Sequence, residues 1–358
     1  MTRYLLIFVT LLGFYQQPVA ASEVTLLQAF HVAEIYTANS PSGHDTDTYN
    51  GDPHYVIEVP VDNEMKRVWI HRTHGRVSKI ESGPVEATNL EYQWPGIRVV
   101  AHRGGVGLDV PENTLPAIQR AIDIGAQLVE IDIRETRDGH LILMHDTTVD
   151  RTTDGSGRVE ELTLEEIKAL DAGGWHSGRY RGTEVPTLQE ALALMKGKIS
   201  PDLDFKDGDV EKLVAVVNSV GVAGESYYHG SIENSRKLND LQPDIFLRPS
   251  VSHSVDIHQT VRSLWPPLIN LNWHAVTDEN IRLIHLLGAQ AFVNTLSTAD
   301  TLLNVELAAE AGADYIQTDY PDKVIALLRE KGLMYDESKD VSGRIHPLGN
   351  ERLSYPLR

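Results

Sequence analysis

The chain has 358 residues, no cysteine and a formal net charge of −19 at pH 7. Disulfide bonds are therefore excluded, and a packed hydrophobic core has to stabilise the fold. The negative charge disfavours nucleic acids and anionic membrane surfaces as partners, because both carry charge of the same sign. It does not exclude an anionic small molecule, since a bound cation can reverse the local potential.

Residues 1–21 have the pattern of a signal peptide for export. Arg3 gives a positive start, Tyr4–Phe14 is an apolar run, and the small residues 19–21 suit a cleavage site. The alternative, an uncleaved anchor, is disfavoured because the run is shorter than the ~20 residues that span a bilayer. We therefore expect an exported protein, periplasmic or secreted, with no stable membrane insertion after cleavage.

Residues 22–81 predict a small α+β region in front of the main domain. A helix is expected over residues 24–38 and a polar loop over residues 39–53. Three strands are then expected at 55–60, 67–72 and 76–81, the first two joined around Asp62-Asn63. This order weakly resembles the PepSY module of exported bacterial proteins, and an irregular extension packed on the main domain is the alternative. Residues 82–96 are expected to form a linker.

From residue 97 to residue 334, strand-like apolar segments alternate with amphipathic helices. The expected strands are 97–102, 128–133, 199–204, 226–229, 245–248, 268–271, 290–294 and 315–318. The expected helices are 114–124, 188–196, 209–220, 232–240, 278–287, 301–311 and 321–331. Eight parallel strands with intervening helices predict an α/β fold, a (β/α)8 TIM barrel, followed by a C-terminal extension over residues 335–358. A doubly wound open sheet is the alternative, but no GxGxxG loop follows the first strand.

An extra hairpin strand and a small insertion interrupt this alternation. Asp138-Gly139 lies between two apolar alternating runs, so residues 140–145 are expected to pair antiparallel with the strand before them. If these two residues form the loop, Asp132 lies directly opposite His145. Residues 146–186 then include a short helix at 164–169 and are expected to lie over the barrel mouth.

Polar residues gather at the carboxyl ends of the expected strands, where the active sites of such barrels lie. His102 follows the first strand, and Glu130 and Asp132 leave one face of the second because they are two residues apart. Other polar residues at strand ends are Asp204, Lys206, Asn294 and Asp319. Between the first two strands, Asn113 is expected to cap the helix and Gly125 to end it.

Nine short motifs in this region resemble those of the glycerophosphodiester phosphodiesterase family. They are HRG (102–104), PENT (111–114), EID (130–132), TRDG (136–139), HD (145–146), RTTDGSG (151–157), PTLQEAL (186–192), DFK (204–206) and TDYP (318–321). The resemblance covers about residues 98–331, and this many ordered motifs make it specific. Residues 227–230 (YYHG) depart from the Ser-Phe that the family usually carries there.

The resemblance implies metal-dependent hydrolysis of glycerophosphodiesters to an alcohol and glycerol 3-phosphate. The matching positions make Glu130, Asp132 and Asp204 the ligands of a divalent cation, Ca²⁺ or Mg²⁺, both of which prefer oxygen ligands. Asp204 stands where the family has Glu and is one methylene shorter. Three acids at one rim would repel each other without a cation. The alternative is that they only form ion pairs with Lys206, Arg103 and Arg134.

The resemblance also implies that His102 and His145 carry out the proton transfers, which suits imidazoles because they titrate near neutral pH. Arg103 and Lys206 are expected to stabilise negative charge on the phosphate oxygens, and Asn294 to contact the substrate, a small-molecule phosphodiester. Two other functions remain open. One is a phospholipase D-like attack on lysophospholipid headgroups, and the other is a non-catalytic lipid- or glycan-binding barrel.

Overall fold

The structure is a computed structural model, and it describes residues 43–49, 52–61, 64–71, 77–83, 96–264, 266–286 and 289–336. It divides into two compact units, with the boundary between Gln93 and Trp94. The predicted signal peptide and the predicted helix at 24–38 lie outside the described residues. Most of the predicted linker and of the predicted C-terminal extension also lie outside them.

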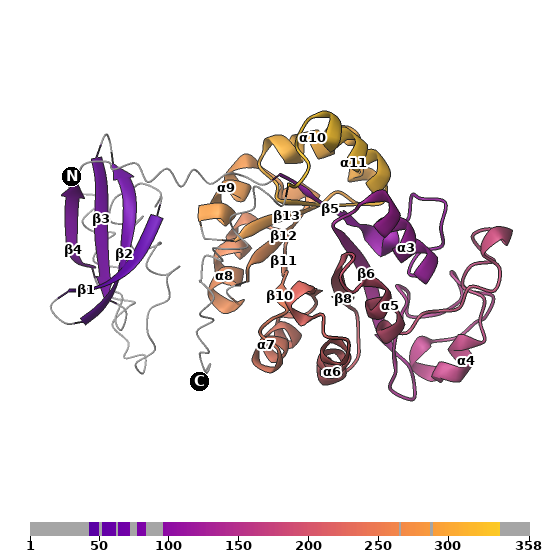
Figure 1. The fold of residues 1–358 in the computed structure, drawn as a ribbon. Coiled ribbons are helices and arrows are strands. Elements are labelled where there is room, and N and C mark those ends of the chain that lie inside the picture. The colour runs from indigo at the N-terminus through magenta and orange to yellow at the C-terminus, as the bar shows by residue number, and fades with distance from the viewer. Residues whose placement is uncertain are drawn as a thin grey trace. The chain divides into compact units, whose positions relative to one another are not determined.

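The first unit contains a four-stranded antiparallel sheet whose strands pair in chain order (Figure 1). The strands are β1 (Gly43–Tyr49), β2 (Asp52–Val61), β3 (Glu64–His71) and β4 (Val77–Gly83). The register pairs Val61 with Glu64, as expected for a connection at residues 62–63. The polar loop predicted over residues 39–53 is wrong, because β1 pairs with β2 along its whole length. Edge strands commonly carry polar and charged side chains, so the polar composition of this segment did not exclude a strand.

The second unit is a (β/α)8 TIM barrel, as predicted. Its parallel strands are β5 (Arg98–Ala101), β6 (Leu128–Glu135), β8 (Ser200–Phe205), β9 (Tyr227–His229), β10 (Phe246–Leu247), β11 (Ser250–Val251), β12 (Leu268–Asn272), β13 (Gln290–Asn294) and β14 (Tyr315–Thr318). They follow the order β10-β9-β8-β6-β5-β14-β13-β12-β11. Buried side chains of Val100, Leu128, Leu268, Phe292 and Tyr315 form one cluster of the core.

One interrupted strand closes the barrel. The predicted strand at 245–248 is in fact β10 and β11, which pair with β9 and β12 respectively. Between them, the amide of Arg248 donates to Tyr228 on one side, and the carbonyl of Pro249 accepts from Asn270 on the other. Proline has no amide hydrogen, so the ladder breaks at this residue.

Helices surround the strands on the outside of the barrel (Figure 1). They are α3 (Leu115–Ile124), α5 (Leu188–Met195), α6 (Val210–Val220), α7 (Ile232–Leu241), α8 (Ser254–Leu264), α9 (Asp278–Leu286), α10 (Leu302–Glu310) and α11 (Pro321–Glu330). Helix α8 was not predicted, but its Ile257, Val261 and Leu264 are buried at helical spacing. Among the helices that the structure describes, none has the length and apolar character to cross a bilayer.

The predicted hairpin exists, but its register differs by one residue. Strand β7 (Leu141–Leu143) pairs antiparallel with β6, with Ile133 opposite Leu143, and the amide of Met144 donates to the carbonyl of Asp132. His145 is therefore not opposite Asp132. The loop has three residues rather than two, with Gly139 in the left-handed region at φ 84°. Such a loop moves the pairing by one position.

The segment after this hairpin has an apolar core of its own. It contains α4 (Leu164–Lys168), as the sequence predicted, and a buried cluster of Ile142, Met144, Val149, Val159, Ile167, Ala172 and Val185. The segment contacts the loop that follows β5. The Tyr180 hydroxyl donates to the carbonyl of Asp109, and Arg151 forms an ion pair with Glu112.

Candidate active site

Three carboxylates lie together at the carboxyl ends of two neighbouring strands. Glu130 and Asp132 lie on β6, and the parallel register pairs Asp132 with Asp204 of β8. One oxygen of each lies within 4.8 Å of the others. Glu130 and Asp132 are buried, with 1% and 0% of their surface exposed. The predicted ligand set is therefore assembled by two strands in direct contact.

Burial makes this cluster electrostatically unfavourable without positive charge. Burial, followed by the nearby carboxylates of Asp132 and Asp204, raises the pKa of Glu130 well above its ordinary value. The ammonium of Lys206 opposes this effect only in part. A divalent cation among the three oxygens would remove the repulsion, and hard cations prefer such ligands. The residues present therefore fit a Ca²⁺ or Mg²⁺ ion.

Asn113 supports the cluster instead of capping a helix. Its side-chain amide donates to Asp132 Oδ2 at 2.7 Å, and its oxygen accepts from the Asp132 amide at 3.1 Å. Thr114 caps α3 in its place, with its hydroxyl accepting from Ala117. The prediction of Asn113 as the cap was thus wrong by one residue. The buried Asp132 needs the donor, and Asn113 reaches it from a left-handed backbone conformation at φ 54°.

Lys206 and Arg103, predicted to bind phosphate, contact the carboxylates directly. Lys206 Nζ lies 3.0 Å from Asp132 Oδ1 and also bonds Asp204. Burial would lower the pKa of Lys206, but these two carboxylates raise it above its ordinary value. Arg103 Nε lies 3.1 Å from Asp132 Oδ2, and its backbone amide donates to Glu130 at 2.9 Å. The Lys206 and Arg103 side chains therefore lie at the carboxylate cluster.

Arg134, the third predicted ion-pair partner, lies elsewhere. Its guanidinium pairs with Asp207 and donates two hydrogen bonds to the carbonyl of His145, at 2.9 and 2.7 Å. Arg134 thus holds the backbone after β7. Its contacts are with Asp207 and His145, and not with the three clustered carboxylates. Of the three basic residues that the sequence offered as ion-pair partners of the clustered acids, only Lys206 and Arg103 form such pairs.

His102 is oriented by an acid that directly follows β14, the last strand of the barrel. Its Nδ1 lies 2.6 Å from Asp319 Oδ1, and its Nε2 lies 3.9 Å from Glu130 Oε2. The backbone amide of Asp319 donates to Asp300, which also accepts from the Thr318 hydroxyl. The turn after His102 packs closely on α3, because a Cβ on Gly104 would lie 2.6 Å from a side chain there. Glycine is required at this approach.

His145 has an equivalent partner in its sequence neighbour. Its Nδ1 lies 2.7 Å from Asp146 Oδ1. Arg151 bonds both Asp146 and Glu112, and Arg103 bonds Glu112 as well. Hydrogen bonds from Arg151 are the main reason why the pKa of Asp146 lies well below its ordinary value. A chain of ion pairs therefore connects the His145 side of the site to Arg103.

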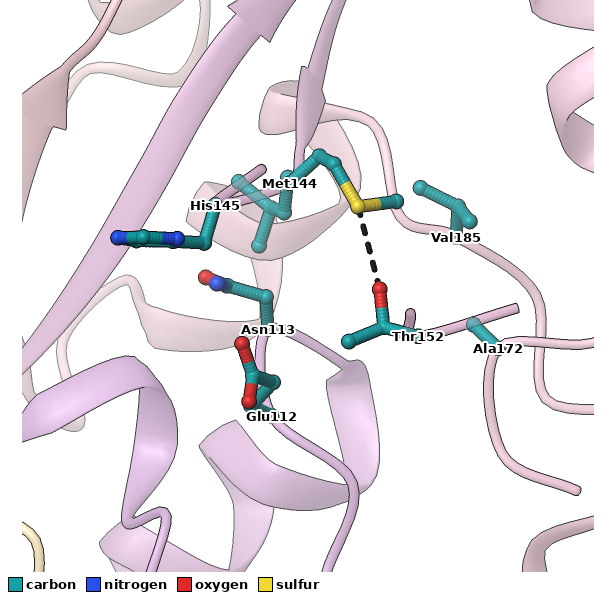
Figure 2. A pocket seen from close by; sticks show the side chains of 8 residues that line it. Glu112, Asn113, Met144, His145, Thr152, Ala172 and Val185 are labelled. Carbon is teal, nitrogen blue, oxygen red and sulfur yellow. Dashed lines mark hydrogen bonds between the residues drawn. The ribbon is translucent and has the colours of Figure 1, made fainter. Parts of the chain in front are cut away.

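A small cavity of about 10 Å³, roughly the room of one water molecule, lies beside His145. Figure 2 shows the imidazole on the side of Asn113 and Glu112, while Met144 turns the other way and accepts a hydrogen bond from Thr152. Consecutive side chains thus point to opposite sides, one toward the polar cluster and one toward the apolar core.

Asn294 lies at the carboxyl end of β13, in register with Asn272 of β12. Its side-chain oxygen accepts from the amide of Leu296 at 3.1 Å. Asn294 therefore lies at the same end of the barrel as the carboxylates and His102. Among the described residues, its side chain makes no hydrogen bond to them.

Three supporting residues were not assigned a role from the sequence. They are Asp319, Asp146 and His229, the last of which contacts Asp204 through a hydrogen bond. The TDYP and HD motifs contained a signal for Asp319 and Asp146. No local pattern indicated His229, because its partner Asp204 lies on another strand.

Comparison with known proteins agrees with this geometry. Residues 102–219 match the model of the glycerophosphoryl diester phosphodiesterase family. A glycerophosphodiester phosphodiesterase from Caldanaerobacter subterraneus subsp. tengcongensis is 32% identical over 249 residues, which is 65% of this chain and 98% of that protein.

Two solved structures show the same fold. A glycerophosphodiester phosphodiesterase from Agrobacterium tumefaciens has a TM-score of 0.59 and 29% identity, covering 64% of this chain and 99% of that one. An Oleispira antarctica phosphodiesterase in complex with the product sn-glycerol-3-phosphate has a TM-score of 0.58 and 25% identity, covering 65% and 97%. The barrel, the nine motifs and these relatives lead to one conclusion: the chain belongs to the glycerophosphodiester phosphodiesterase family.

Proposed function

We propose that this enzyme hydrolyses glycerophosphodiesters to an alcohol and glycerol 3-phosphate, with a divalent cation and two histidines. The observation that carries the proposal is the cluster of Glu130, Asp132 and Asp204, of which the first two are buried, with His102 Nε2 at 3.9 Å from Glu130. The Oleispira antarctica relative, solved with sn-glycerol-3-phosphate, supports the product.

Glu130, Asp132 and Asp204 would hold the cation. When bound, Ca²⁺ or Mg²⁺ supplies Lewis-acid polarisation of the phosphodiester. Lys206 and Arg103 lie beside the same carboxylates and would bind the remaining phosphate oxygens through charge-assisted hydrogen bonds. Asn294, at the carboxyl end of β13, would contact the alcohol or the phosphate.

His102 and His145 would share the proton transfers. Each has Nδ1 bonded to a carboxylate, from Asp319 and Asp146 respectively, which leaves Nε2 for the substrate. In the proposed reaction, one Nε2 accepts a proton from the attacking water and the other donates a proton to the leaving alcohol oxygen. The carboxylates favour the charged imidazole that forms in the first transfer.

We also propose that residues 1–21 are removed on export and that the enzyme acts in the periplasm or outside the cell. Residues 22–81 would form a separate small domain before the linker 82–96 and the barrel at 97–334. Mass spectrometry of the mature chain would test the cleavage, and a chain that retains Met1 after export would contradict it.

The decisive experiment measures phosphate released by alkaline phosphatase after incubation of the enzyme with glycerophosphocholine. We expect release with added Ca²⁺ or Mg²⁺ and none in EDTA. Choline released from lysophosphatidylcholine, without glycerol 3-phosphate from glycerophosphocholine, would favour the phospholipase D-like function. Binding without turnover of either compound would favour a non-catalytic barrel.

A further inference from the structure

A third imidazole lies at the carboxylate cluster, on a strand that the proposed mechanism does not use. His229 ends β9, and the parallel register places it beside Asp204 of β8. Its Nδ1 lies 3.2 Å from Asp204 Oδ1. The other oxygen of Asp204 bonds Lys206. Asp204 is therefore held by a separate group on each oxygen.

The second ring nitrogen of His229 also has a hydrogen-bond partner. Its Nε2 lies 2.8 Å from the hydroxyl of Ser250 on β11. The buried side-chain amide of Asn270 on β12 donates to that hydroxyl at 2.6 Å. Three consecutive elements of the barrel wall thus contribute to one hydrogen-bonded chain that ends on Asp204.

The direction of these hydrogen bonds follows from the carboxylate. As a ligand of the proposed cation, Asp204 acts as an ionised carboxylate, and its other oxygen bonds the ammonium of Lys206. An ionised carboxylate only accepts hydrogen bonds, so Nδ1 of His229 is the donor. In the neutral imidazole, Nε2 is then the acceptor, and Ser250 donates to it. The chain fixes both the ring orientation and its tautomer.

We propose that His229 is a positioning residue that holds Asp204 in the orientation needed to ligate the cation. The inference rests on the proposed cation site and goes beyond it, because it assigns a role to a residue that touches neither cation nor substrate. Asp204 has two rotatable side-chain bonds and only one strong competing partner, Lys206. Without His229, Lys206 is the remaining hydrogen-bond partner of the Asp204 side chain among the described residues, and it favours rotation of the carboxylate toward its ammonium.

Supporting hydrogen bonds to metal ligands contribute strongly to affinity, and their loss typically weakens cation binding about 10–100-fold. Ser250 should contribute less, because it is exposed and water can replace its hydroxyl. We therefore expect His229→Leu to weaken cation binding by about tenfold or more. Ser250→Ala should weaken it by no more than about threefold.

The test is isothermal titration calorimetry of the purified chain with Ca²⁺ and, in parallel, with Mg²⁺. Two variants of similar size to histidine separate the effect of the lost hydrogen bond from the effect of the lost side-chain volume. His229→Asn places an amide donor near the position of Nδ1, and His229→Gln places one near Nε2. We expect Asn to restore most of the affinity that Leu loses, and Gln to restore little. His274 is exposed in the turn Trp273–Ala275 after β12, and His274→Leu is the matched control that should leave affinity unchanged.

A cation affinity of His229→Leu or His229→Gln within twofold of wild type would overturn the inference and leave the cation site intact. Equal cation affinities for the Asn and Gln variants would also overturn it, because a donor at the position of Nδ1 would then be no better than one at the position of Nε2. A wild-type chain that binds neither cation would overturn the cation site itself, and the inference with it. Thermal melts in EDTA verify that each variant is folded.

Discussion

The imidazole of His102 and the carboxylate of Asp319 meet at 2.6 Å, although 217 positions separate them in the sequence. His145 makes the same kind of contact at 2.7 Å with Asp146, its immediate neighbour. In both pairs Nδ1 faces the acid. Asp319 is distant from His102 in the sequence and Asp146 is adjacent to His145, yet each acid bonds Nδ1 and leaves Nε2 for the substrate.

Asp319→Asn tests the long-range pair. An amide at this position can stabilise either tautomer and adds no negative charge beside a forming imidazolium. We expect kcat to fall by about 10–10³-fold, with KM and Ca²⁺ affinity nearly unchanged. Steady-state kinetics on glycerophosphocholine and calorimetry provide the two measurements.

The exposed Asp240 of α7 is a suitable control, because Asp240→Asn removes the same charge away from the barrel mouth. A similar loss of kcat in that variant would mean that net charge, and not orientation of His102, is responsible.

The two histidines should behave as one catalytic unit. His102→Ala and His145→Ala should each lower kcat by about 10²–10⁴-fold, the usual loss for a general acid or base. The double variant should lose much less than the product of these factors, because residues acting together are not additive. Each single variant should also lack one limb of the pH–rate profile. Near-wild-type kcat in either would exclude that histidine from the reaction.

Substitutions in the carboxylate cluster should weaken cation binding and lower activity together. Glu130→Gln and Asp204→Asn each remove a charged ligand, so calorimetry should show weaker Ca²⁺ binding in step with lower kcat. Asn294→Ala should raise KM several-fold and leave cation affinity unchanged, since no recorded contact ties Asn294 to the carboxylates. Unchanged cation affinity in Asp204→Asn would remove β8 from the ligand set.

Arg151 should stabilise the fold in a pH-dependent manner. Its hydrogen bonds are the main cause of the low pKa of Asp146. Burial opposes a low pKa for Glu112, but Arg151 and Arg103 hold it below 4.5. Groups with a depressed pKa stabilise the native state above their ordinary values of 3.8 and 4.5, and this stabilisation is lost as the pH falls.

Arg151→Gln should therefore lower the free energy of unfolding by about 1–2 kcal/mol at pH 7, after discounting for the exposure of Arg151. The difference from wild type should shrink progressively as the pH falls below about 4.5, toward the depressed pKa values of Glu112 and Asp146. Urea unfolding in EDTA across this range is the measurement. Arg158→Gln removes an equally long side chain from an exposed pair with Glu160 and should have no measurable effect. A difference that grows as the pH falls would contradict the assigned sign.

Local features of the sequence were sufficient for the barrel and for most of the site. Strands and helices alternate with clear periodicity, and each predicted strand of the barrel has an observed counterpart. Glu130 and Asp132 share a face because strand geometry alternates every residue, whatever the rest of the chain does. Gly125 ends α3 in the left-handed conformation, as its lack of a side chain suggested.

Contacts between distant segments were decided only by the tertiary structure. The register of β6 and β7 depends on whether the turn has two or three residues, and the left-handed Gly139 selects three. Asn113 leaves the cap position because a buried carboxylate on the next strand needs its amide. The pairs His102–Asp319 and Asp204–His229 exist because β5 pairs with β14 and β8 pairs with β9, which places the ends of these strands side by side. Periodicity within one segment carries no information about which strands pair.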